Sequence, residues 1–468
     1  MHTYILARQQ ASADLWHDSP VVESGTKASR APRHPGKSEN RRGLRGRASP
    51  AAAMGVIEAR LLGLLTPQRI RTYPVIGLVV VGLVALADTL AGSSLLRGRD
   101  FLAFYTAGRL LSQGTAMRLL DANAQDAFQR ALMETDIDYV SVWGNPPYVA
   151  WLFVPFAQLP YGWAFAAFMA ISVAFMLGAF RALRHELTLG LSVGTMAWVT
   201  LLYFPSVIWL LNGQMTALWL GTLIAVFVLL RRGCDVRAGL ALGILACKPQ
   251  LAFGLCVVLL AARRFRALAA AGASGLGLVL LGVVTLPDVM EGYFRHAPDL
   301  VRLVRSSGFH DAGLHGSFEF ATLLLDGWSP RLANVLGVLA TLAMLLLIGA
   351  SWLRQGWHPA TRAWDLRMAA SLALGVVASP HLFAYDLVLL VLPLFIVVAH
   401  YPSKGQRPLG GGSLLGTTAV LWALGLLGPV LTVVQQALTT RCLGFPMAIQ
   451  LGVVAVLFWA RKVQTQTA

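Results

Sequence analysis

A series of long apolar segments constrains the fold of this chain more than any other feature. Hydrophobic residues make up 56% of the 468 positions and charged residues only 13%, whereas soluble domains usually carry about 25% charged residues. Such segments cross a bilayer as helices, because a helix satisfies its own backbone hydrogen bonds in lipid. The sequence therefore predicts an all-α polytopic membrane protein. The approximate segments are 74–91, 147–181, 190–211, 213–230, 238–262, 266–286, 331–353, 365–380, 383–400, 413–434 and 445–460.

Short basic clusters separate these segments, and since lysine and arginine beside a span favour the cytoplasmic side, we place all of them inside. Segment 147–181 must then cross once, as a short or re-entrant element over 147–160 followed by a span over 161–181. Segment 238–262 must begin and end inside, as two short half-helices that meet at Lys248-Pro249-Gln250. About ten full crossings result, with both termini cytoplasmic.

The first 53 residues differ from the rest of the chain. They are polar and basic, carry too little apolar surface to fold, and lack the apolar core of a signal peptide. We expect either a disordered cytoplasmic tail or a chain whose true start is Met54. Residues 54–462 then form one membrane domain, and 463–468 form a short cytoplasmic tail. The net charge of +16 is concentrated in the N-terminal tail and in short loops, which is typical of membrane orientation and not of nucleic-acid binding.

Several other classes of site lack support in the sequence. His310 and His315 lie five residues apart, but only Asp311 accompanies them, so the pattern does not favour a metal site. The four cysteines lie in or beside apolar segments without metal-ligand spacing, and we interpret them as small core residues. The chain contains no Walker motif, no GxGxxG that opens a helix and no GxSxG, so nucleotide and serine-hydrolase chemistry are unsupported.

The unusual polar residues gather near the outer face on this topology. Lys248 points into the same half from the break in its segment. A charge at membrane depth is costly and marks a functional candidate, the alternative being a lysine whose long side chain reaches the interface. This asymmetry predicts an active site that faces outward. The outer positions are Asp100, Asn145-Pro146-Pro147, Asn212-Gly213-Gln214, His310, His315, and Ser379-Pro380-His381 with Asp386.

Asp100 opens a large outer loop that follows the first apolar segment. A carboxylate at the lipid–water boundary, followed by aromatic residues, can act as a base on a substrate delivered from the membrane; the alternative is an exposed loop charge. Residues 101–120 have apolar side chains at helical spacing, which predicts a helix that frames a lipid at the interface or packs onto the bundle. Asp121 is expected near the start of a second helix. His381 could bind a phosphate or sugar, or satisfy a broken helix end.

Taken together, these motifs resemble glycosyltransferase family 87, whose members have the GT-C fold. The resemblance covers about 74–400. One departure is Leu120-Asp121, where the family often has Tyr-Asp, and this difference bears on the fit of the acceptor. The matching motifs are Asp100-Phe101, Phe104-Tyr105, Ala107-Gly108, Gly114, Leu120-Asp121, Asn145-Pro146-Pro147, Pro155, Leu159-Pro160-Tyr161, Gly213-Gln214, Ala246-Cys247-Lys248-Pro249-Gln250, Ser379-Pro380-His381 and Tyr385-Asp386.

The resemblance implies a GT-C-like bundle of about 10–12 transmembrane helices with interfacial helices in the first outer loop. It also implies a transferase of the inner (plasma) membrane that needs no cofactor or metal. Such an enzyme moves a sugar, mannose in the best-known members, from polyprenyl phosphate to a hydroxyl of an envelope glycolipid or glycan on the extracytoplasmic side.

The implied mechanism inverts the anomeric centre, with Asp100 as general base. One carboxylate suffices because phosphate is already a good leaving group. The implied substrate- or donor-binding residues are Arg99, Tyr105, Asn145, Gln214, Lys248, Gln250, His381 and Asp386. The charge on the leaving phosphate needs cations, for which the candidates are Lys248, Arg97, Arg99, Arg295, Arg302 and Arg305.

Two other functions stay open at this point. A lipid or small-molecule transporter or flippase would also have broken helices and polar residues at membrane depth. It would not need a carboxylate base in a long loop, and it usually has an internal repeat, which this sequence does not show. A polymerase or ligase of lipid-linked glycans would share the outer-face chemistry and differ in its acceptor.

Overall fold

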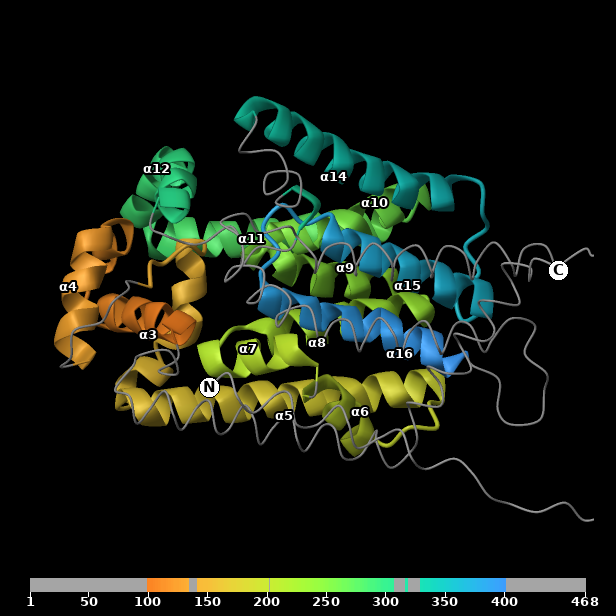
Figure 1. Cartoon of the computed structure of the whole chain (residues 1–468), viewed down its shortest axis with the longest axis horizontal. Helices are drawn as coiled ribbons and strands as arrows, with labels where there is room; N and C mark the ends of the chain where they lie inside the picture. Colours follow the sequence, from red (N-terminus) through yellow and green to blue (C-terminus); the bar gives the residue numbers. More distant parts are fainter. Residues whose placement is uncertain (1–98, 134–140, 202, 307–315, 319–328, 401–468) are drawn as a thin grey trace, which may run out of the picture. The chain divides into compact units, whose positions relative to one another are not determined.

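The computed structural model describes residues 99–133, 141–201, 203–306, 316–318 and 329–400, and its elements there are helices (Figure 1). Every described residue belongs to one unit of the chain, Pro50–Ala468. The predictions for the N-terminal tail, the first span, the last two spans and the C-terminal tail lie outside the described residues, as do His310 and His315.

Short 3-10 helices (η) interrupt a series of α-helices. The elements are α3 (Arg99–Ser112), η1 (Ala116–Leu120), α4 (Ala122–Met133), η2 (Pro147–Phe153), η3 (Phe156–Gln158), α5 (Tyr161–Leu187), α6 (Val193–Leu201), α7 (Phe204–Asn212), α8 (Thr216–Arg231), α9 (Asp235–Gly243), η4 (Ile244–Cys247), η5 (Pro249–Leu251), α10 (Phe253–Ala261), α11 (Phe265–Thr285), α12 (Pro287–Ser306), α14 (Pro330–Leu353), α15 (Arg362–Val377), η7 (Ala384–Leu390) and α16 (Val391–Ala399).

Three described helices are long and apolar enough to cross a membrane: Tyr161–Leu187, Phe265–Thr285 and Arg331–Leu353. Each leaves large apolar side chains exposed along its length, such as Phe175 of α5 and Leu346 of α14, which is expected where lipid replaces water as the solvent. A fourth candidate joins α6 and α7, which are bent by 85°, so the predicted segment 190–211 is not one straight helix. The full count of crossings stays a prediction.

The buried face of α5 follows its sequence. Its buried residues recur every three or four positions, from Ala164 and Phe168 to Leu183 and Leu187, so they form one stripe along the helix. The helix packs against α8. In contrast, α8 and α15 are buried on nearly all sides, so shorter helices occupy the middle of the bundle while the long spans expose one face.

The two predicted irregularities of the apolar segments are confirmed. Residues 147–160 form the short helices η2 and η3, and the span α5 begins directly after Pro160. Segment 238–262 is broken at Lys248, with α9 and η4 before it and η5 and α10 after it. The break places backbone that is not α-helical inside the bundle, where η4 contacts α8 and α11.

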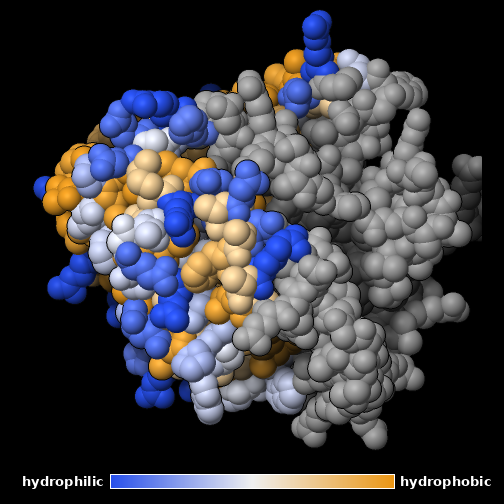
Figure 2. All heavy atoms as spheres, turned by 90° about the vertical axis from the view of Figure 1, so that its left-hand side faces the viewer, coloured by the Kyte–Doolittle hydropathy of each residue, from blue (hydrophilic) through white to orange (hydrophobic). Residues whose placement is uncertain are grey.

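Helices α3, α4 and α12 gather at one end of this unit, on the left in Figure 1. Figure 2 faces that end and shows hydrophilic residues mixed with apolar ones over the described surface. Phe101 to Gly108 are all buried, so α3 packs into the protein. Of the two alternatives for residues 101–120, this agrees with packing onto the bundle. Asp121 accepts hydrogen bonds from the backbone N–H groups of Asn123 (2.9 Å) and Ala124 (3.3 Å), which confirms its predicted place at the start of α4.

Candidate active site

Lys248 lies at the break between η4 and η5, with backbone angles φ −145° and ψ 70° that belong to neither helix. Its Nζ is 2.7 Å from Oδ1 and 2.6 Å from Oδ2 of Asp386, the third residue of η7. The Lys248 side chain is only 11% exposed and that of Asp386 is fully buried. A buried charge needs a partner, and the residue that the sequence pattern singled out finds it 138 positions further along the chain.

The surroundings of this ion pair restrict the lysine further. The backbone N–H of Phe383 donates to Oδ2 of Asp386 at 3.1 Å and so fixes the carboxylate. Nζ of Lys248 also lies 5.2 Å from the ring centre of Tyr385 and 5.9 Å from that of Phe383. These two rings are stacked, with centres 5.2 Å apart and planes at 14°. The ammonium group therefore sits between a carboxylate and two aromatic faces, where cation–π attraction adds to the ion pair.

Asp100 belongs to the same neighbourhood. It lies in the first turn of α3, half-buried, where a negative charge is stabilised by the helix dipole. The negative charges of Asp100 and Asp386 both act on the hydroxyl of Tyr385, and α3 contacts α7, which in turn packs against η7. Asp100, Lys248, Tyr385 and Asp386, which come from three separate parts of the sequence, thus form one cluster.

The turn between α7 and α8 packs against the start of α3. Gly213 has φ +68°, and a Cβ there would stand 2.7 Å from Cβ of Phe101 and 2.7 Å from a ring carbon of Phe165. Only glycine meets both the left-handed backbone and the close approach. The carbonyl of Gln214 accepts a hydrogen bond from the indole of Trp209 at 2.8 Å. This turn therefore packs directly against the first turn of α3, which also carries Asp100.

Tyr148 is a residue of this region that the sequence analysis missed. Its hydroxyl donates to the carbonyl of Ala246 at 2.9 Å, two residues before Lys248. Burial raises the pKa of the Tyr148 hydroxyl, so it remains a donor. The signal that could have found it is its position directly after Asn145-Pro146-Pro147. Asn145 itself is half-buried at the bend before η2.

Two buried glutamines of α4 hold the chain segment before Asn145 in place through hydrogen bonds. Gln125 accepts from the backbone N–H of Trp143 at 2.8 Å. Gln129 makes hydrogen bonds of 2.8 and 3.0 Å to the backbone of Ser141.

The remaining predicted site residues lie as follows. Gln250 is half-buried in η5, two residues after Lys248, and His381 is half-buried in the turn that enters η7. Tyr105 is 1% exposed, and its hydroxyl donates to the carbonyl of Leu159 at 2.8 Å. Arg295 is exposed and pairs with Glu291. Arg97 and the side chains of Arg99, Arg302 and Arg305 lie outside what the structure describes.

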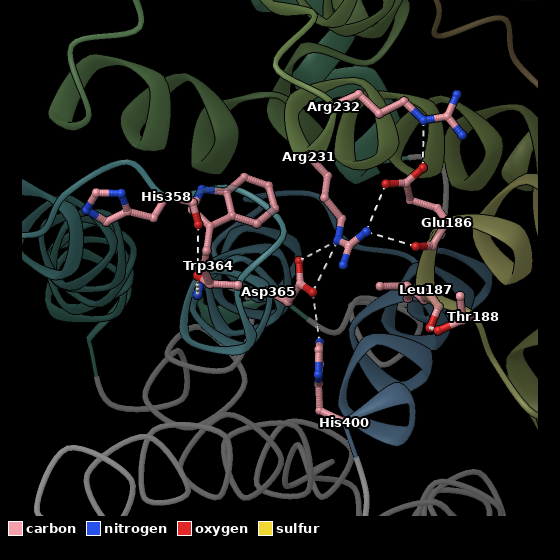
Figure 3. Close-up of polar contacts among 10 residues, drawn as sticks. Glu186, Leu187, Thr188, Arg231, Arg232, His358, Trp364, Asp365 and His400 are labelled. Carbon is pink, nitrogen blue, oxygen red and sulfur yellow. Dashed lines mark hydrogen bonds and ion pairs between the residues drawn. The ribbon is translucent and has the colours of Figure 1, made fainter. Parts of the chain in front are cut away.

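A second charge network lies at the ends of α5, α8, α15 and α16 (Figure 3). Arg231 is central: its Nη1 is 2.8 Å from Oε1 of Glu186 and its Nε is 3.0 Å from Oδ1 of Asp365. Arg232 pairs with Glu186 at 2.6 Å, and Nε2 of His400 lies 2.8 Å from Oδ2 of Asp365. The sequence analysis treated such basic residues only as short clusters between spans and did not foresee the acidic partners of Arg231 and Arg232, the half-buried Glu186 and the buried Asp365.

Two of these four helices, α8 and α16, contact η7, which carries Tyr385 and Asp386. Helix α8 begins just after Gln214 and ends at Arg231, whereas α16 follows η7 and ends before His400. The Lys248–Asp386 pair and the arginine network therefore lie at opposite ends of α8 and α16.

The model of glycosyltransferase family 87 matches residues 143–380, just over half of the chain. The match contains Asn145, Gln214, Lys248 and Gln250, whereas Asp100 lies before it. No curated protein and no solved structure matches the chain.

Proposed function

The chain belongs to glycosyltransferase family 87 and is a membrane glycosyltransferase, and from this premise we propose that it uses a polyprenyl-phosphate sugar as donor. The acceptor is a hydroxyl of an envelope glycolipid or glycan, and mannose is the first sugar to test. The reaction takes place at the extracytoplasmic face of the inner membrane, the end of the bundle that carries Asp100.

One observation carries the proposal: the Lys248–Asp386 pair and the ring of Tyr385 lie together, and η7, which carries Asp386 and Tyr385, packs against α7, a neighbour of the helix that begins with Arg99 and Asp100. The cluster combines a half-exposed carboxylate with a buried cation and aromatic rings. A carboxylate can take a proton, a cation can stabilise a phosphate, and aromatic faces can border a sugar. The arginine network, in contrast, is at the end where the positive-inside rule puts the cytoplasm.

The proposed reaction is a single displacement. Asp100 takes the proton of the acceptor hydroxyl, and the acceptor oxygen attacks the anomeric carbon. The bond between that carbon and the phosphate oxygen breaks, and polyprenyl phosphate leaves with the electron pair. Attack from the face opposite the leaving group inverts the anomeric centre. Lys248 stabilises the charge that develops on the phosphate, and Arg99, Asn145, Gln214, Gln250 and His381 are candidates to hold the donor.

Replacing Asp100 by asparagine tests this proposal. The variant keeps the size of the side chain but cannot accept a proton, so transfer in purified protein should fall by about 10²–10⁴-fold, with donor binding nearly unchanged. Asp121→Asn is the matched control: Asp121 is an exposed carboxylate of the same loop, and asparagine caps a helix almost as well. Near wild-type transfer by Asp100→Asn would place the base elsewhere, and loss of donor binding would make Asp100 a binding residue.

A further inference from the structure

Lys248 is already paired with Asp386, and this limits how a donor phosphate can bind the lysine. Both oxygens of Asp386 lie within 2.7 Å of Nζ, and the Phe383 N–H holds one of them in place. With the two rings of Phe383 and Tyr385 nearby, the positive charge already has a neutralising partner and little exposed surface. A phosphate that binds Lys248 must therefore take the place of this carboxylate.

Competition between Asp386 and phosphate for Lys248 would help product release, because donor and product differ in charge. In the donor, the phosphate is a diester with one negative charge. In the product it is a monoester that carries about −1.5 to −2 at neutral pH. A buried lysine without a counter-ion would bind the product more tightly than the donor, because charge attraction is strong where water is excluded. Release of the product would then be slow.

We propose that Asp386 is the resident counter-ion of Lys248, which the donor phosphate displaces and which returns to Lys248 as polyprenyl phosphate leaves. The inference rests on the proposed function, since it requires a donor that carries phosphate. In this role Asp386 does not touch the reacting atoms. It sets the affinity of Lys248 for phosphate.

The test compares wild-type protein with Asp386→Asn, using a short-chain polyprenyl phosphate as the probe. Removing the competing charge should tighten binding of the probe by about tenfold or more, since a hydrogen bond to a charged group is worth at least that factor. KM for the donor and kcat should both fall, because donor binds better and product leaves more slowly. In Lys248→Met/Asp386→Asn the gain in affinity should vanish. Weaker or unchanged binding by Asp386→Asn would overturn the inference.

Stability provides a second readout, because Asp386→Asn leaves a buried lysine without its partner and such changes destabilise proteins. Asp365→Asn is the matched control: Asp365 is equally buried and pairs with Arg231 in the arginine network. Both variants should unfold at a lower temperature than wild type. Inorganic phosphate or the prenyl phosphate should restore only Asp386→Asn, since phosphate replaces the missing carboxylate there. If Asp386→Asn is not restored, or Asp365→Asn is restored equally, the inference is wrong.

The wild-type protein separates this inference from the proposed function. If wild type neither binds prenyl phosphate nor transfers sugar from it, the proposed function fails. If wild type does both, but Asp386→Asn does not bind prenyl phosphate more tightly, only the role of Asp386 fails.

Discussion

At the scale of single residues, Lys248 carries a positive charge at the break between η4 and η5, where the buried carboxylate of Asp386 neutralises it. Lys248→Met should raise KM for the donor by about tenfold or more, because a charge-assisted contact to phosphate is lost. The variant also leaves Asp386 buried without a cation, so donor kinetics should be measured on the fraction that elutes as folded protein. A donor KM equal to that of wild type would make the lysine purely structural.

At the scale of elements, one hydrogen bond joins two helical breaks: Tyr148 of η2 donates to Ala246 of η4. Tyr148→Phe removes that bond, worth about 1 kcal/mol, and frees the turn that carries Lys248. We expect KM for the donor to rise about fivefold, while kcat at saturating donor changes little. Ser371→Ala is the control. Ser371 of helix α15 accepts a buried hydrogen bond from the indole of Trp352, and its loss should leave KM as in wild type. Equal effects of both variants would show that Tyr148 supports only the fold.

At the scale of the whole molecule, the two charged clusters predict an orientation. If the arginine network faces the cytoplasm, cysteines placed at Ser94 and Ser306 should label from outside, and a cysteine at Lys404 only from inside. The background should lack the native cysteines, and labelling of intact cells with a membrane-impermeant thiol reagent is the measurement. Labelling of Lys404→Cys from outside, or of Ser306→Cys only from inside, would reverse the topology.

A feature of this molecule could be predicted from the sequence where residues adjacent in the chain determine it, and not where it depends on packing between distant segments. The break at Lys248 and the start of α5 after Pro160 follow from local backbone chemistry, because proline ends or starts a helix. The partnership of Lys248 with Asp386 does not, since it depends on how η7 packs against α7 and α8. The same holds for Asp365, whose partner Arg231 lies 134 residues away. The bend between α6 and α7 was also missed, because segment 190–211 is apolar throughout and only Pro205 hinted at it.

The pair formed by Arg231 and Asp365 has a consequence for how the protein is made. Helix α15 carries Arg362, Asp365 and Arg367 in its first two turns, and charges within a helix oppose its insertion into the membrane as an isolated segment. The chain emerges from the ribosome from its N-terminus, so Arg231 is already in the membrane when Asp365 is synthesised. Helix α15 is therefore expected to insert against helices that are already in the membrane. A ribosome stalled far enough beyond residue 377 for α15 to have left the exit tunnel would show, in chains with and without α8, whether α8 must be present for that step.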